Sequence, residues 1–561
     1  MRSMIRPALA AVLLAGAPAA LAQEGASRGP GIEVRELGMV DPFQVGTSQA
    51  LSDQAWVSGD AATTRALLNA LPAADSQGWQ SGLASRLAAR ALLSAGPPPR
   101  GADNSFALAA IRADRALAAA GAREAFALLE RTPRLSQSAA LSRIHAEAAF
   151  ALGETTAACR TADQLLQGRD QAYWLRARAV CSALGGNTAA AELTAELARS
   201  VEDAPAFDAL LDAYTLNRDL PGDARPTTGI ELALAHEVAP QASLQVSEGA
   251  PLWLAEAAQS YGPPIDLPQL PADALDVARG LEGTERNAAL GALAGQDVDR
   301  GVAAEALALR LSEAAANDRF VEVARAYGNE VETLPITAET LAWGKGFVLA
   351  ALLNGDLETA RIWREALMDG PPRMRMDDPF GGAAGGPGTG SASGAAGLVP
   401  PQNTGLPAYE PEWTRPPAET MVVLDYALAI AEDRLSGPGF EAILAARVET
   451  GTPSRLAEAA GLAALNVPVP ASVRAALLPQ PQETGEPGEL GAMPATGFLP
   501  AGLMAARMQA LAETQLTAAR MVEAGGITPA ALYGAAAILE EAGLRREARR
   551  LVLEAVAEGA M

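Results

Sequence analysis

A glycine followed five positions later by an alanine recurs along this chain, within stretches rich in alanine and leucine. The pairs are Gly153 with Ala158, Gly186 with Ala191, Gly355 with Ala360 and Gly543 with Ala548, and Gly121 with Ala125 is one residue shorter. The intervals from Gly121 to Gly153 and from Gly153 to Gly186 are 32 and 33 residues, close to the roughly 34-residue period of paired-helix repeats. The pattern predicts an all-α chain of stacked helical hairpins, an α-solenoid with disordered Gly/Pro-rich insertions.

The composition agrees with many short helices. Hydrophobic residues make up 49% of the 561 residues, but aromatic residues only 4%. Alanine supplies much of the apolar fraction, and it both favours helix and lets neighbouring helices approach closely. The sequence lacks the sustained alternation of β-branched residues that would indicate a strand. Helices are expected near residues 61–71, 79–95, 105–120, 122–131, 137–151, 154–167, 170–184, 187–200, 205–217, 419–434, 439–449 and 454–464, with a hairpin over 337–369 that turns at Gly355.

Changes in composition divide the chain. The run from Gly381 to Gly397 is Gly/Ser-rich and cannot bury enough apolar area to fold. A second Pro/Gly-rich stretch lies between two helical regions. The predicted segments are a signal peptide (1–22), an extended arm (23–50), N-terminal repeats (51–220), a middle helical region (221–370), a disordered linker (371–419), a helical region (420–478), a loop (479–500) and C-terminal hairpins (501–561).

The amino-terminal residues predict export. Arg2 and Arg6 precede a short apolar run, and Ala20-Leu21-Ala22 offers the small residues that signal peptidase requires. We expect cleavage after Ala22 and a soluble periplasmic or secreted protein, since no later segment is long and apolar enough for a membrane span.

The two cysteines fit an oxidising compartment. Cys159 and Cys181 lie on consecutive predicted helices, each 11 residues from Asp170 at the turn between them. Antiparallel helices would bring the two sulfurs together, so we expect a disulfide, which would stabilise the fold by about 3 kcal/mol. Two buried free thiols are the alternative.

The small residue that follows each turn, as in Ala158, Ala191, Ala360 and Ala548, resembles the tetratricopeptide-type hairpin. The stretches LGMVDPFQVG, ALLNALP and YWLRARAVCSALGGNTAAAELTAELAR are also similar to a group of uncharacterised secreted helical-repeat proteins of Gram-negative bacteria. This resemblance implies the fold and the location, and it brings no assigned activity.

No motif in the sequence indicates catalysis or a metal or cofactor site. His145 and His236 are the only histidines, and neither has a histidine or cysteine at ligand spacing. His145 could act as a general base with Glu147 as its partner, but residues two apart do not share a helix face. His236 beside Glu237 is interpreted in the same way. Both histidines are therefore expected to be structural.

Other candidates also favour structural interpretations. Lys345, the only lysine, follows Trp343-Gly344, but the upstream glycine of a phosphate loop is missing and Gly346 replaces its Ser or Thr. Asp377-Asp378 lacks the alternating ligands of a calcium loop. Ser391 and Ser393 lie in the predicted linker, where nothing would hold a nucleophile rigid.

Five tryptophans could line a sugar-binding groove, although those at helical spacing are expected in the core. Trp413 lies outside any predicted helix, and it could make a docking contact or tether the linker to the body of its own chain. The five are Trp174, Trp253, Trp343, Trp363 and Trp413.

The formal net charge of −23 disfavours nucleic acid and anionic membranes and favours basic or neutral partners. The leading hypothesis is a non-catalytic scaffold that binds a protein or peptide in the cell envelope. The alternatives are an enzyme acting on cell-wall polymer, with the helical body as its platform, and a structural or surface-layer component.

Overall fold

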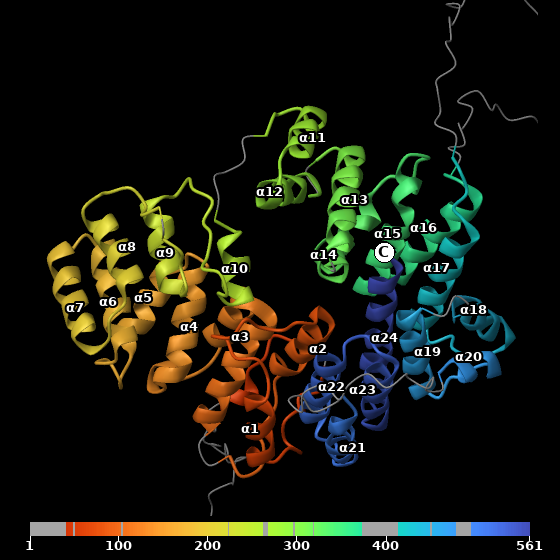
Figure 1. Ribbon diagram of the computed structural model, residues 1–561, viewed down its shortest axis with the longest axis horizontal. Helices are drawn as coiled ribbons and strands as arrows, with labels where there is room; N and C mark the ends of the chain where they lie inside the picture. Colours follow the sequence, from red (N-terminus) through yellow and green to blue (C-terminus); the bar gives the residue numbers. More distant parts are fainter. Residues whose placement is uncertain are drawn as a thin grey trace, which may run out of the picture. The chain divides into compact units, whose positions relative to one another are not determined.

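The described residues form a series of α-helices joined by short turns, several of which contain glycine (Figure 1). The computed structural model describes residues 41–48, 51–102, 105–222, 224–261, 267–295, 298–317, 319–372, 413–448, 452–477 and 495–561. Within these ranges there is no strand, and the only pairings of extended backbone are isolated bridges between Ser48 and Ser94 and between Asp60 and Arg100. The fold is therefore all-α. The predicted signal peptide, most of the arm, most of the linker and most of the 479–500 loop lie outside the described residues.

The N-terminal helices up to residue 215 match the predicted spans within a few residues at each end, and no spans were predicted for the two that follow. They are α1 (Ala61–Asn69), α2 (Gly82–Leu92), α3 (Ser105–Glu130), α4 (Ala139–Ala151), α5 (Thr155–Gln164), α6 (Ala172–Leu184), α7 (Thr188–Val201), α8 (Pro205–Thr215), α9 (Gly229–Val238) and α10 (Leu252–Ala258).

The middle of the chain holds shorter helices, and the last part forms hairpins again. The remaining α-helices are α11 (Pro271–Gly280), α12 (Gly283–Leu293), α13 (Arg300–Ala316), α14 (Phe320–Tyr327), α15 (Gly344–Asn354), α16 (Leu357–Asp369), α17 (Ala418–Ala431), α18 (Pro438–Val448), α19 (Pro453–Ala464), α20 (Ala471–Ala476), α21 (Leu499–Arg507), α22 (Leu511–Gly525), α23 (Pro529–Glu541) and α24 (Arg545–Ala560). Single 3-10 turns occupy Pro42–Gln44, Leu135–Gln137, Gly328–Thr333, Thr340–Trp343 and Ala495–Phe498.

The recurring glycines make the turns that the sequence predicts. All five have a positive φ between +75° and +84°, the left-handed region that side chains with a Cβ adopt only at a cost. Gly121 interrupts α3 in this way and divides it into the two helices expected on either side. The partner alanines are fully buried, because a larger side chain there would push the paired helices apart. These residues are Ala125, Ala158, Ala191, Ala360 and Ala548.

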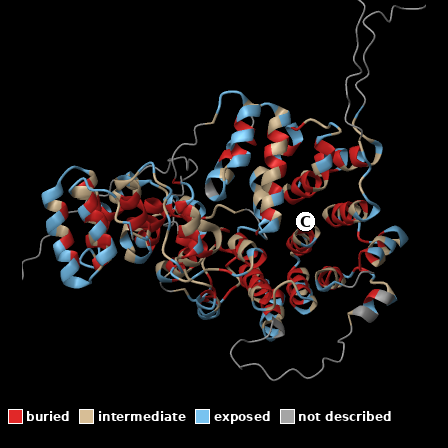
Figure 2. Cartoon of the chain, turned by 45° about the horizontal axis from the view of Figure 1, so that its top comes forward, coloured by how far each residue is buried: buried red, intermediate tan, exposed pale blue. Residues whose placement is uncertain are grey.

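Most helices turn a buried side toward their neighbours, as Figure 2 shows in red. One apolar cluster extends from Phe43 to Ala557, and a second fills the space among α4 to α9. The described part of the predicted arm lies on the end of α2, where Thr47 N donates to Leu93 O (2.9 Å) and Phe43 is fully buried. Trp174 and Trp363 are core residues, as expected.

The first helices pack directly on the last ones. In Figure 1, α2 lies beside α22 and α24, and the contacts agree. Gln515 Nε2 donates to Leu87 O (2.8 Å), and the hydroxyl of Thr64 donates to Glu513 Oε1 (2.6 Å). Residues Asp41–Met561 form one compact unit.

Trp413 packs beside the end of α16. A Cβ added to Gly370 would lie 3.4 Å from Trp413 Cε3, and Arg415 Nη2 is 3.7 Å from Met368 Sδ. The described residues on the two sides of the 373–412 gap therefore lie close together. This contact supports the tethering role considered for Trp413.

Candidate functional site

A groove of about 770 Å³ lies along α3 and α4. Its walls are mostly apolar or small, and they include Ala110, Ile111 and Ile144. Residues far along the chain complete it, namely Thr227 and Thr228 before α9 and Trp253 on α10. Trp253 is fixed there because its Nε1 donates to Ala74 O (2.7 Å).

Glu147 is the buried carboxylate of the groove. Glu147 is 8% exposed, and its Oε2 accepts a hydrogen bond from Gly229 N (2.7 Å) at the first turn of α9. That approach requires glycine, since a Cβ at position 229 would lie 2.2 Å from Glu147 O. The other oxygen, Oε1, is buried and makes no hydrogen bond of regular geometry among the described residues, but the hydroxyl of Tyr173 is close enough to lower the pKa of Glu147.

Burial and the neighbouring polar groups act in opposite directions on the charge of Glu147. Burial raises the pKa of Glu147, although the Gly229 amide and the positive charge of Arg143 act in the opposite direction. Arg143 lies over the ring of Tyr173, with its Cζ 5.0 Å from the ring centroid. Asp114 also lines the groove, where it contacts Arg115 and accepts from Ala74 N (3.2 Å). The groove thus offers apolar walls and, among its lining residues, one buried carboxylate.

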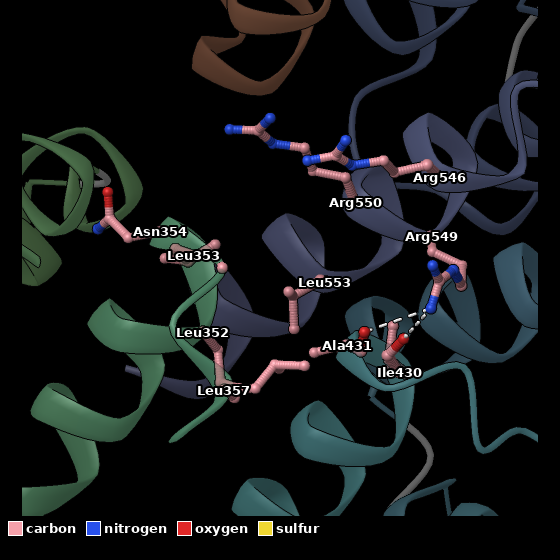
Figure 3. Close-up of a pocket in the computed structure, with 11 residues that line it drawn as sticks. Leu352, Leu353, Asn354, Leu357, Ile430, Ala431, Arg546, Arg549, Arg550 and Leu553 are labelled. Carbon is pink, nitrogen blue, oxygen red and sulfur yellow. Dashed lines mark hydrogen bonds between the residues drawn. The ribbon is translucent and has the colours of Figure 1, made fainter. Parts of the chain in front are cut away.

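A second cavity, of about 240 Å³, lies where α15, α16, α17 and α24 meet (Figure 3). Leu352, Leu357 and Leu553 supply its apolar surface, and Arg546, Arg549 and Arg550 of α24 supply its charge. Figure 3 shows Arg549 turned toward Ile430 and Ala431, whose carbonyls accept hydrogen bonds from its Nη1 (3.3 Å each).

Next to this cavity, one carboxylate meets four arginines. Glu554 is fully buried, and its oxygens lie 3.0 Å from Arg86 Nε, 3.1 Å from Arg90 Nη1, 2.5 Å from Arg325 Nη2 and 3.4 Å from Arg550 Nε. Burial opposes its charge, but the arginines hold the pKa of Glu554 far below its ordinary range.

Most residues singled out in the sequence have structural roles here. Cys159 and Cys181 form the expected disulfide, with Cα atoms 5.5 Å apart. His145 is buried, with Nε2 2.8 Å from Glu130 Oε1 and Nδ1 3.0 Å from the hydroxyl of Thr161. His236 packs against the ring of Tyr261, with centroids 4.4 Å apart.

Lys345 lies in the first turn of α15, where its Nζ donates to Ala560 O and so anchors the end of α24. Of the five tryptophans, Trp253 lines the groove. Asp377, Asp378, Ser391 and Ser393 lie outside the described residues.

Sequence reasoning missed both cavities as sites. The groove combines α3 and α4 with residues about 100 positions later, and no motif links them. The second cavity could have been suspected from the sequence, because four arginines occur close together in a strongly acidic chain, in the run Arg545-Arg546-Glu547-Ala548-Arg549-Arg550.

Comparisons of the chain with protein-family models, with curated proteins and with solved structures find no match. Among the described residues, no helix is long and apolar enough to cross a bilayer. The same residues contain no cluster of three or more His, Cys, Asp or Glu side chains able to hold a metal ion.

Proposed function

We propose that this protein is a non-catalytic, tetratricopeptide-like scaffold of the cell envelope that binds a segment of a partner protein in the α3–α4 groove. The observation that carries the proposal is the groove itself, with apolar walls around a buried carboxylate. Ligand sites typically combine an apolar surface with a few convergent polar groups. Export after Ala22 and the solenoid arrangement are parts of the same proposal.

The charge of the site specifies the partner's chemistry. A lysine or arginine of the bound segment would be attracted to the Glu147 carboxylate and would favour its charged form. The net charge of −23 favours the approach of such a segment. We therefore expect a segment with apolar side chains around one basic residue.

Selection from a displayed library of random peptides tests this function. We expect the enriched peptides to carry a basic residue between apolar ones. Ala107→Trp, which fills the groove from an exposed wall position, should reduce their binding at least tenfold. Ala189→Trp on the exposed face of α7 is the matched control and should leave binding unchanged.

Glu147→Gln keeps an acceptor for Gly229 N but removes the charge. It should reduce binding of the basic peptides and leave matched peptides with glutamine in place of the basic residue unaffected. Equal binding of both peptides to the wild type, or full binding to Ala107→Trp, would exclude the groove as the site.

One observation favours the enzyme as a second candidate. A buried carboxyl group whose pKa is raised, as at Glu147, has the property of a general acid, and Trp253 of the same groove offers a surface for a sugar ring. Release of soluble fragments from purified cell wall by the wild type, abolished in Glu147→Gln, would establish this function instead.

A further inference from the structure

The arginine-lined cavity of Figure 3 is formed by helices other than those of the groove, so its ligand can be considered independently. Its two kinds of lining surface are distinct. Leu352, Leu353, Leu357, Ile430 and Leu553 form the apolar part, whereas Arg546, Arg549 and Arg550 form the charged part. No carboxylate is among the described residues that line it.

The three arginines differ in how far they are already engaged. Arg549 donates to the last carbonyls of α17, and its Nε lies 3.8 Å from Asp433 Oδ1. Among the described residues, Arg550 forms an ion pair with Glu554, at 3.4 Å, and the same carboxylate oxygen lies closer to Arg90 and Arg325. Arg546 is exposed and makes no ion pair or hydrogen bond with any described residue.

Arg546 and Arg550 are one helical turn apart, and residues at this spacing are neighbours on the helix surface. Figure 3 shows both side chains extending in the same direction from α24. Burial and the nearby Arg90 lower the pKa of Arg550, whereas Glu554 and Glu547 raise it; Arg546 makes a smaller contribution that lowers it, so the two charges repel each other weakly. An anion between them would remove that repulsion.

The cavity's size and apolar part define the rest of the ligand. At about 240 Å³ it is smaller than the roughly 300–1,000 Å³ of pockets for drug-sized molecules. An inorganic anion would leave the leucine surface uncovered. An arginine pair, in contrast, suits a carboxylate, which guanidinium groups bind through paired hydrogen bonds.

We propose that this cavity binds a small organic carboxylate, held by Arg546 and Arg550 through its oxygens and by Leu352, Leu357 and Leu553 through its apolar body. The site requires no catalysis and does not depend on the proposed role of the α3–α4 groove.

Calorimetric titration of the full chain with hexanoate tests the proposal. We expect hexanoate to bind at least tenfold more tightly than acetate, inorganic phosphate or hexanol, since each of these lacks one half of the interaction. The double variant Arg546→Gln, Arg550→Gln should lose at least tenfold in hexanoate affinity. Arg65→Gln, an exposed arginine on α1, is the matched control and should bind like the wild type.

A second variant separates the two halves of the site. Leu357→Ala keeps both arginines and should weaken hexanoate binding severalfold while acetate binding stays the same. Circular dichroism and thermal unfolding confirm that each variant is folded. Undiminished binding to the double variant, no binding of hexanoate at millimolar concentration, or phosphate binding as tightly as hexanoate would overturn the proposal.

Discussion

Single residues in this protein show how burial decides the role of a titratable group. His145 was a conceivable base in the sequence, but in the structure both ring nitrogens have partners and the ring is 2% exposed. Glu147, two positions on, is also buried, at 8% exposed, but it lines the groove. Side chains so close in sequence point to different surroundings because residues two apart lie on different helix faces.

His145 predicts a dependence of stability on pH. Burial lowers the pKa of His145 below its ordinary 6.5, although the hydrogen bond with Glu130 acts in the opposite direction. The unfolded chain therefore takes up the proton first as the pH falls. The free energy of unfolding therefore decreases as the pH falls below 6.5, by at most about 1.4 kcal/mol for each pH unit, whereas above pH 6.5 His145 has no such effect.

Chemical unfolding at pH 7.5 and 5.5 measures the effect. Carboxylates contribute their own pH dependence, so the quantity to compare is the difference between the wild type and His145→Gln. The variant should lose less free energy of unfolding over this interval. An equal loss in both proteins would show that His145 can be protonated in the folded state.

At the scale of elements, the sequence predicted α1 to α8 and α16 to α19 within a few residues, but no bounds were predicted for α9 to α14. Helix ends are determined locally, by turn glycines and by capping residues such as Thr228 and Thr528, whose hydroxyls accept hydrogen bonds from backbone amides three residues on. The hairpin turn at Gly355 and the pairing of Cys159 with Cys181 follow from the same local rules. The 3-10 turn Thr340–Trp343, which precedes α15, was not expected, because no simple periodicity distinguishes it from the helix that follows.

The turn at Gly355 provides a test of this local control. Gly355 has φ +81° and open space around its Cα, so Gly355→Ala should destabilise by about 1–2 kcal/mol through the backbone alone. Gly439, in the first turn of α18, also has open space but no positive φ. Gly439→Ala is thus the control and should be neutral or slightly stabilising. Urea unfolding distinguishes them, and equal effects would contradict the argument.

At the scale of the molecule, the packing of α2 on α22 and α24 could not be predicted from the sequence. The contacts join residues more than 400 positions apart, such as Leu87 with Gln515 and Arg90 with Glu554. Neither periodicity nor a motif marks such a pair. For the same reason the groove and the arginine-lined cavity, which combine distant helices, emerged only in three dimensions.

Glu554 tests how strongly this packing depends on charge. Glu554→Gln preserves the shape of the side chain but leaves four arginines without their shared carboxylate. Breaking a buried ion pair in this way should cost about 3–5 kcal/mol. Glu541→Gln, at the exposed pair with Arg507, is the control and should change the free energy of unfolding little. A Glu554 variant as stable as the wild type would show that apolar packing alone joins these helices.

The pairing of α2 with the carboxyl-terminal helices also has a consequence for the order of assembly. Arg90 is synthesised 464 residues before Glu554. While the chain is emerging from the ribosome, α2 can pack on α3 early, but its contacts with α22 and α24 form only after more than 400 further residues have been added. Nascent chains stalled before α22 should accordingly be cleaved by protease within α2 faster than the 561-residue chain.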